Sequence, residues 1–267
     1  MTMRFYKITT TATPIEPESI DMAPFIKFKE KFNKWIHSSI QLVTGLPKSY
    51  YIVSGVTDAF NQMYGMYNKI GVFEGEYGYH SLVIKNRVTF NLDDADAIVI
   101  SHPFSADGMS SHEKIKIADS YNKPIFVDCA FFGVCHDINF DFSGYKNIHS
   151  VCFSLSKSFG TGLHRVGLLY TVDPYPVTVY SQWHYPLVAG ADHHYTLLDS
   201  ISPDSMIKKY KNAQLTVCQE FNLIPSNTIL FGLDYSEKYV SFKRGPVNRL
   251  CISKLLKQNY EIPVFNK

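Results

Sequence analysis

The sequence predicts an α/β protein: a mostly parallel sheet with helices on both faces, plus a small α+β domain. The first observation is a series of short, almost wholly apolar runs, and the second is the helical composition of segments between them, 57–64 and 112–121. Such runs are typical of strands buried on both faces. The expected strands are 51–53, 70–73, 95–101, 124–128, 150–154 and 166–170.

A change of pattern near residue 200 is the third observation. A helical segment follows Ser202 and extends to Phe221, and strand-like runs come after it at 228–231 and 249–253. We therefore expect residues 46–200 to form a large domain that carries the ligand site. We expect residues 201–267 to form the small domain and residues 1–45, with a short amphipathic helix at about 28–42, to complete it.

Composition excludes several classes of protein. With 267 residues, 45% of them hydrophobic, the chain can bury a large core, which argues against disorder. The formal charge of +2 is spread along the chain, so we expect no nucleic-acid partner. Without a signal-peptide core or an apolar run of membrane-span length, a cytoplasmic protein with no membrane partner is expected. The five cysteines lack C-x-x-C spacing and are expected to be reduced thiols.

Polar residues mark the ends of several expected strands, which is where open α/β sheets bind ligands. Asp128 stands alone at the end of a strongly apolar strand and needs a cationic partner. Lys157 lies just past another strand, among serines and glycines whose hydroxyls and backbone could bind an anion. These residues and Arg165 could equally form a structural ion network, and their spacing alone does not choose between the two.

Four short motifs resemble fold-type I pyridoxal-phosphate (PLP) enzymes, the aspartate aminotransferase superfamily. The family's lysine loop resembles residues 154–167, S-L-S-K-S-F-G-T-G-L-H-R-V-G. Its D-x-A-Y segment is similar to residues 128–131, D-C-A-F. H-P-F-S-A-D-G at 102–108 is similar to N-P-x-N-P-T-G, and S-G-V-T at 54–57 resembles the phosphate-binding turn. The motifs follow the family order over residues 50–170, which makes the resemblance specific.

The resemblance implies a role for each matching residue. Lys157 would form the Schiff base with PLP and then move a proton on the substrate, and Asp128 would pair with the protonated pyridine nitrogen. The cofactor phosphate would lie on a set of backbone N–H groups and side chains: Gly55, Val56, Thr57, Ser154 and Arg165.

Two further roles rest on weaker local patterns. Tyr79 is the first choice for the aromatic ring that stacks on the cofactor, although ordinary packing explains the tyrosines of segment 76–80 nearly as well. Arg249 resembles the family's strand-borne arginine that binds the substrate α-carboxylate. An exposed strand arginine with no such role is the alternative.

The chain departs from the family in three respects. Phe131 replaces the family tyrosine, and Ser105 replaces its second asparagine, so two hydrogen-bond donors to the cofactor's O3′ are missing or shortened. Since such bonds are worth about 1.5–3 kcal/mol each, we expect the Schiff base to stay protonated to higher pH than usual. The chain is also short for the family, and the resemblance implies a homodimer.

The expected function is that of a PLP-dependent aminotransferase acting on a small amino acid or keto acid. A PLP-dependent lyase or decarboxylase and a catalytically degenerate PLP-binding protein are the alternatives, since they share these motifs. A metal hydrolase built on Asp192, His193 and His194 is disfavoured, because adjacent histidines of a strand point to opposite faces. We expect no metal.

Overall fold

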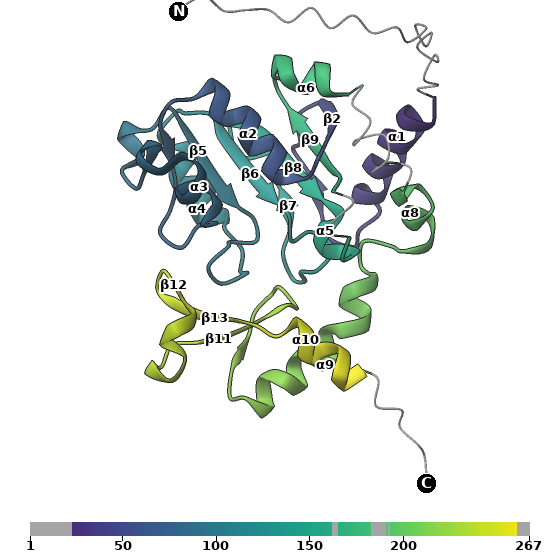
Figure 1. Ribbon diagram of the computed structural model, residues 1–267, viewed down its shortest axis with the longest axis vertical. Coiled ribbons are helices and arrows are strands. Elements are labelled where there is room, and N and C mark those ends of the chain that lie inside the picture. Colours follow the sequence, from purple (N-terminus) through teal and green to yellow (C-terminus); the bar gives the residue numbers. More distant parts are fainter. Residues whose placement is uncertain (1–22, 162–164, 183–190, 192, 261–267) are drawn as a thin grey trace, which may run out of the picture.

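The computed structural model describes residues 23–161, 165–182, 191 and 193–260 (Figure 1). Its main sheet has seven strands in the order β2-β9-β8-β6-β5-β3-β4. β9 runs antiparallel to both of its neighbours, β2 and β8, and the other neighbouring pairs are parallel. The strands, in spatial order, are β2 (Ser49–Val53), β9 (Gly167–Thr171), β8 (Ile148–Ser154), β6 (Ile125–Cys129), β5 (Ala97–Ser101), β3 (Ile70–Gly71) and β4 (Val88–Thr89). The predicted α/β fold is confirmed.

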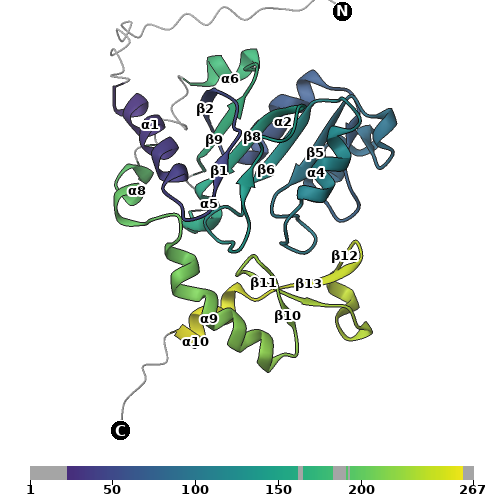
Figure 2. The ribbon, with the colours of Figure 1, turned by 180° about the vertical axis from the view of Figure 1, so that it is seen from behind.

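Helices cover both faces of this sheet because alternate residues of its strands point to opposite sides. In β5, Ile98 and Ile100 belong to one buried cluster, whereas Ala97 and Val99 belong to another. The first cluster lies under α1 (Ala23–His37) and α4 (His112–Asp119), and the second under α2 (Val56–Met66). Figures 1 and 2 show these two faces from opposite sides.

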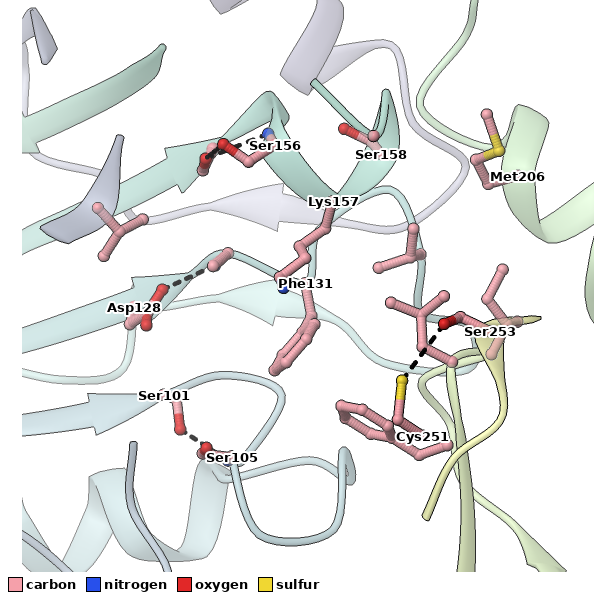
Figure 3. A pocket seen from close by; sticks show the side chains of 18 of the residues that line it. Ser101, Ser105, Asp128, Phe131, Ser156, Lys157, Ser158, Met206, Cys251 and Ser253 are labelled. Atoms are coloured by element: carbon pink, nitrogen blue, oxygen red, sulfur yellow. Dashed lines mark hydrogen bonds between the residues drawn. The ribbon is translucent and has the colours of Figure 1, made fainter. Parts of the chain in front are cut away.

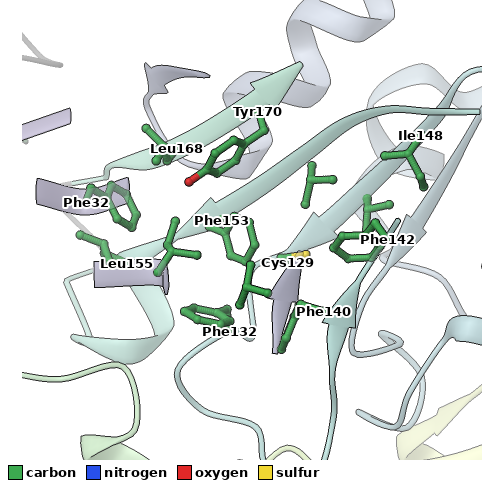
Figure 4. Close-up of a cluster of buried hydrophobic side chains, with 14 of the residues drawn as sticks. Phe32, Cys129, Phe132, Phe140, Phe142, Ile148, Phe153, Leu155, Leu168 and Tyr170 are labelled. Atoms are coloured by element: carbon green, nitrogen blue, oxygen red, sulfur yellow. The ribbon is translucent and has the colours of Figure 1, made fainter. Parts of the chain in front are cut away.

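Aromatic rings anchor the segment that follows β6. Phe132 packs edge-on against both Phe140 and Phe153, with ring centroids 5.0 Å apart in each pair (Figure 4). All three rings are fully buried. Such contacts contribute about 0.5–1.5 kcal/mol each beyond the burial of area. They fix the backbone that follows Asp128, a residue of the candidate site described below.

The N-terminal helix corrects the expected domain boundary. Phe28 and Phe32 of α1 are buried in the core of the seven-stranded sheet, and Tyr170 of β9 donates a hydrogen bond to Asn33. Trp35 donates from Nε1 to the carbonyl of Ile201 at 2.6 Å. The described part of segment 1–45 therefore belongs to the large domain, and the expectation that it completes the small one is wrong.

The C-terminal part forms a second, antiparallel sheet in the order β10-β11-β13-β12. Its elements are β10 (Ile224–Pro225), β11 (Phe231–Asp234), β13 (Val247–Cys251), β12 (Lys243–Arg244), α9 (Ser205–Glu220) and α10 (Ser253–Tyr260). β11 begins three residues later than expected, because Thr228 and Ile229 instead bond to the carbonyls of Gly108 and Val134 in the large domain.

Short elements complete the architecture. They are β1 (Val43–Thr44) paired with β7 (Phe140–Asp141), helices α3 (Tyr79–Ile84), α5 (Leu155–Ser158), α6 (Pro176–Ser181) and α8 (Leu197–Ser200), and 3-10 helices at Lys85–Arg87, Leu92–Asp94 and Glu237–Phe242. Of the helices that the structure describes, none combines the length and the apolar character needed to cross a bilayer. The five cysteines are free thiols, as expected, and all but Cys251 are buried.

Candidate active site

Strand register brings the predicted site residues to one edge of the large sheet. Ser101 of β5 pairs with Asp128 of β6, and Ser154 of β8 pairs with Gly167 of β9. Gly167 also pairs with Val53 of β2. The carboxyl ends of the parallel strands therefore lie beside the start of β9. The turn after β2 and the segment after β8, which contains Lys157, both begin at this edge.

The turn after β2 has the geometry of an anion site. Gly55 has φ +76°, in the left-handed region that favours glycine, and α2 begins at the next residue with no side-chain cap. Because the first N–H groups of a helix lack intrahelical partners, they remain available to a ligand. Arg165 donates from Nη2 to Thr57 Oγ1 at 2.7 Å, which holds its guanidinium beside the helix start. Nearby, Ser154 Oγ accepts a hydrogen bond from the amide of Ser156 at 3.3 Å.

Gly167 lets the strands approach closely enough to form this turn. A Cβ at Gly167 would lie 2.7 Å from the Phe153 carbonyl oxygen and 3.2 Å from Gly55 Cα. We expect Gly167→Ala to lower the free energy of unfolding by about 1–3 kcal/mol, because backbone atoms must move apart. Urea unfolding measures this change, with Gly144→Ala as the matched control, since a Cβ there meets nothing within 4 Å. Equal stability of the two variants would contradict the prediction.

Asp128 is a buried carboxylate with 7% of its surface exposed. Its Oδ1 accepts a hydrogen bond from the Ala130 amide at 2.8 Å. Burial raises its pKa to about 7; the Ala130 hydrogen bond opposes the rise, while Glu76 adds to it and Lys157 lowers it. In the part of the chain that the structure describes, no ion pair joins Asp128 to Lys157 or Arg165. The alternative of a structural ion network is therefore wrong.

Lys157 lies in α5, one turn of helix directly beyond β8. Ser154 caps this turn, since its side chain accepts from the Ser156 amide. The lysine side chain is exposed and extends into a cavity beside Phe131 (Figure 3). It makes no hydrogen bond or ion pair to any other described residue, which leaves its amine available to a ligand.

Glu76 is a buried residue whose importance the sequence did not reveal. Its carboxylate accepts from the amide and the hydroxyl of Ser101 and from the Tyr77 amide, at 2.8, 2.5 and 2.7 Å. Burial raises its pKa, and the hydrogen bonds from Ser101 lower it. Glu76 thus fixes Ser101 and Tyr77, and both of these residues line the cavity.

The two candidate tyrosines lie in different environments. Tyr77 lines the cavity, whereas Tyr79 is not among the lining residues and donates from its hydroxyl to Asn61 at 3.0 Å. The rings of Tyr77 and Tyr79 stack with centroids 5.9 Å apart. The geometry favours Tyr77 over the first choice, Tyr79, as the ring that faces a ligand. Nothing in the local sequence distinguishes the two.

Arg249 reaches the cavity from the small domain. Its guanidinium lies 4.4 Å from the centroid of the Phe231 ring and donates from Nη1 to the Ser105 carbonyl. Phe131 packs edge-on against Phe231, with centroids 5.2 Å apart. Burial lowers the Arg249 pKa to about 10, and Arg244 adds to this effect. Phe131 thus supports the ring under Arg249.

Ser105 is buried at the polar side of the same cavity. Its amide donates to Ser101 Oγ at 2.7 Å, which links it to Glu76 through Ser101 (Figure 3). The cavity encloses about 770 Å³ between the sheet edge and the small domain. Of the predicted residues it brings together Val56, Thr57, Ser105, Asp128, Phe131, Ser154, Lys157, Arg165 and Arg249. Gly55 is not among the lining residues, and a Cβ built on it would lie 3.1 Å from Arg165 Nη2.

The described residues offer no site for the metal hydrolase considered as an alternative. Asp192 lies outside the described residues, and His194 Nε2 lies 2.6 Å from Thr161 Oγ1. The ring of His194 also stacks on Phe159, with centroids 5.9 Å apart. Among the residues that the structure describes, no group of three or more histidines, cysteines and acidic residues could hold a metal ion.

Comparison with solved structures identifies the fold. The chain is similar to the histidinol-phosphate aminotransferase from Clostridium acetobutylicum, with 15% identity, a TM-score of 0.62, and coverage of 88% of this chain and 86% of that one. A PLP-bound putative aminotransferase from Clostridium difficile has 12% identity and a TM-score of 0.61, covering 87% and 81%. The L-threonine-O-3-phosphate decarboxylase from Porphyromonas gingivalis has 12% identity and a TM-score of 0.59, covering 88% and 89%.

At these identities the similarity establishes a shared fold. The sequence itself matches no protein-family model and no curated protein. The fold therefore agrees with the one that the four motifs imply, and the chemistry has to be argued from the residues of the site.

Proposed function

We propose that this chain is a PLP-dependent enzyme of the aminotransferase type that binds its cofactor at Lys157. The observation that carries the proposal is Asp128, a buried carboxylate beside the cavity that has no cationic partner among the described residues. An unpaired buried carboxylate is costly. The protonated ring nitrogen of PLP is a cation of the right kind to pair with it.

The other residues of the cavity fit the remaining groups of the cofactor. The uncapped start of α2, with Arg165 held on Thr57, suits a phosphate. The exposed amine of Lys157 suits the cofactor's aldehyde carbon. Tyr77, whose amide is fixed by Glu76, offers an aromatic ring.

Each residue would have a distinct task in the reaction. When bound, PLP supplies an electron sink for negative charge at the substrate's α carbon. Asp128 would hold a proton on the ring nitrogen, and Lys157 Nζ would move a proton at the substrate's α carbon. Arg249 would bind the α-carboxylate through its planar fork of N–H donors. Transamination of an amino acid is the reaction that this arrangement supports best.

The experiment is a visible absorbance scan of the purified protein with added PLP, repeated after a panel of amino acids is added. We expect a visible band, its conversion to a pyridoxamine spectrum, and release of a keto acid. A band that amino acids never change would favour the degenerate alternative. Carbon dioxide or an eliminated side chain would identify a decarboxylase or a lyase. Absence of any visible band would refute the cofactor.

A homodimer and a cytoplasmic location also belong to this proposal. The resemblance implies the first, and the five free thiols support the second. Light scattering coupled to size exclusion measures the mass in solution and tests the dimer.

A further inference from the structure

The cavity has two chemically different halves. At the sheet edge the lining carries most of the polar and charged side chains, including Thr57, Ser101, Ser105, Asp128, Ser154, Ser156, Lys157 and Arg165, beside Val56, Phe60, Tyr77 and Ala130. Toward the small domain its lining is mostly apolar and includes Phe131, Val134, Met206, Ile229, Leu230, Phe231 and Leu256, together with Tyr210, Arg249, Cys251 and Ser253. Figure 3 shows Met206 and Cys251 on the side opposite Asp128.

The apolar half is assembled from separate elements. Met206 comes from α9, Leu256 from α10, and Ile229 from the segment before β11. The Ile229 amide donates to the Val134 carbonyl at 2.9 Å, which fixes the small-domain side of this wall to the segment that follows Asp128. Val134, Ile229 and Leu256 are each at most 2% exposed and form the packed backing of the wall, so the apolar surface open to a ligand comes mainly from the half-buried Phe131, Met206 and Leu230.

The charged side chains around the cavity can pair with one carboxylate of the substrate. Four charged side chains line it, and Asp128, Lys157 and Arg165 all lie in the polar half. Under the proposed function these three hold the cofactor. Arg249 is then the one remaining charge among the described lining residues. A second carboxylate or a phosphate on the substrate would find no second cation in this half, where Tyr210 and Ser253 supply the polar side chains beside Arg249 and Cys251, and its desolvation would be costly.

We infer that the substrate is an amino acid with a bulky apolar side chain, branched aliphatic or aromatic, which occupies the half of the cavity around Met206. The inference rests on the proposed function and sharpens it. A small side chain would leave this wall without contacts, and an acidic side chain would leave a charge unpaired.

The test is the binding of three unreactive carboxylates to the PLP-loaded protein, measured by calorimetry. We expect 4-methylpentanoate to bind at least about tenfold more tightly than acetate, since each buried methylene contributes about fourfold. We expect glutarate to bind no more tightly than acetate. Glutarate binding more tightly than 4-methylpentanoate, or no gain from the longer chain, would overturn the inference.

A matched pair of variants locates the wall. Met206→Gln keeps the length of the side chain and should reduce the advantage of 4-methylpentanoate by about fivefold. Leu215→Gln lies on the same helix, where Leu215 is 47% exposed and outside the cavity lining, and should leave the advantage unchanged. Circular dichroism checks the fold of both variants. Equal effects of the two substitutions would contradict the position of Met206 in the wall. The three carboxylates measured on the unaltered protein test the substrate class independently of the variants.

Failure of the inference and failure of the proposed function have different signatures. If PLP gives no visible absorbance, the proposed function fails. If PLP binds normally but the carboxylates show no apolar preference, the inference alone fails. The heat of binding requires no turnover, so a slow or inactive enzyme would not affect the result.

Discussion

Asp128→Asn is expected to stabilise the cofactor-free protein at pH 8 and to weaken the cofactor-loaded protein. Burial raises the pKa of Asp128 to about 7 from its ordinary 3.8. Between these values the native state binds the proton more tightly than the unfolded chain does. Its stability therefore falls as the pH rises from about 4 to about 7, and the whole loss is present above pH 7. The difference between the two pKa values corresponds to about 4 kcal/mol.

Asparagine removes this dependence because its side chain does not ionise. Its oxygen can still accept the hydrogen bond that the Ala130 amide donates to Oδ1. Urea unfolding from pH 4 to pH 8 should give similar stability for both proteins at low pH and a gain of several kcal/mol for the variant at pH 8. Glu76 leaves a slope of the same sign in both proteins, since its pKa is also raised by burial. Because Glu76 and Asp128 repel each other when both are ionised, the difference between the proteins reports the loss of the Asp128 charge together with its coupling to Glu76.

With PLP bound, the sign should reverse. The ionised Asp128 would then have a cationic partner that asparagine cannot supply, and removal of one partner of a buried ion pair costs about 3–5 kcal/mol. Asp137→Asn is the control. Its carboxylate is exposed, and hydrogen bonds from His136 and Lys211 lower its pKa, so its loss should not stabilise the protein at pH 8. An Asp128→Asn variant with the wild-type pH dependence would refute the account.

The sequence was most informative where a whole element is buried on both sides. The apolar runs at 95–101, 124–128 and 150–154 predict central strands, and the structure has strands at Ala97–Ser101, Ile125–Cys129 and Ile148–Ser154, in which every residue but His149 is buried. β4 was missed, since its two residues are half-buried and give no periodic signal. Strand order was also beyond the sequence, because it depends on pairings such as β2 with β9 that join residues far apart in the chain.

The place of α1 could not be predicted for a related reason. An amphipathic pattern reveals that a helix has an apolar face and says nothing of which surface covers it. Phe28 and Phe32 could have packed on either sheet. The choice is made by partners distant in sequence, including the Asn33 contact to Tyr170 and the Trp35 bond to Ile201.

Within the candidate site, residues in local motifs were predictable and residues fixed by distant partners were not. Lys157 and Arg165 stand eight positions apart in one loop, so their spacing is visible in the sequence. Glu76 resembles any exposed acidic residue in a glycine-rich segment. Its burial depends on Ser101, which lies 25 residues further along the chain. The choice between Tyr77 and Tyr79 also depends on the local backbone.

Lys157→Ala is expected to abolish covalent attachment of PLP while leaving the fold intact. The side chain is exposed and has no hydrogen bond or ion pair within the described residues, so its loss should change stability by no more than about 0.5 kcal/mol. Lys157 is the one lysine among the residues that line the cavity, so no other lysine there could replace its amine in moving the proton at the substrate's α carbon. The rate should fall by at least about 10²–10⁴-fold.

Two measurements separate this role from a structural one. Borohydride treatment of the PLP-loaded protein, followed by mass spectrometry of its peptides, should find the cofactor fixed to Lys157 in the wild type and to no peptide of the variant. Lys116→Ala, at an exposed position of α4, is the matched control and should retain both the labelled peptide and the activity. A labelled lysine elsewhere, or undiminished activity of Lys157→Ala, would mean that the cavity serves another ligand. Urea unfolding of Lys157→Ala should match that of the wild type. Matching unfolding curves would show that neither result is due to a damaged fold.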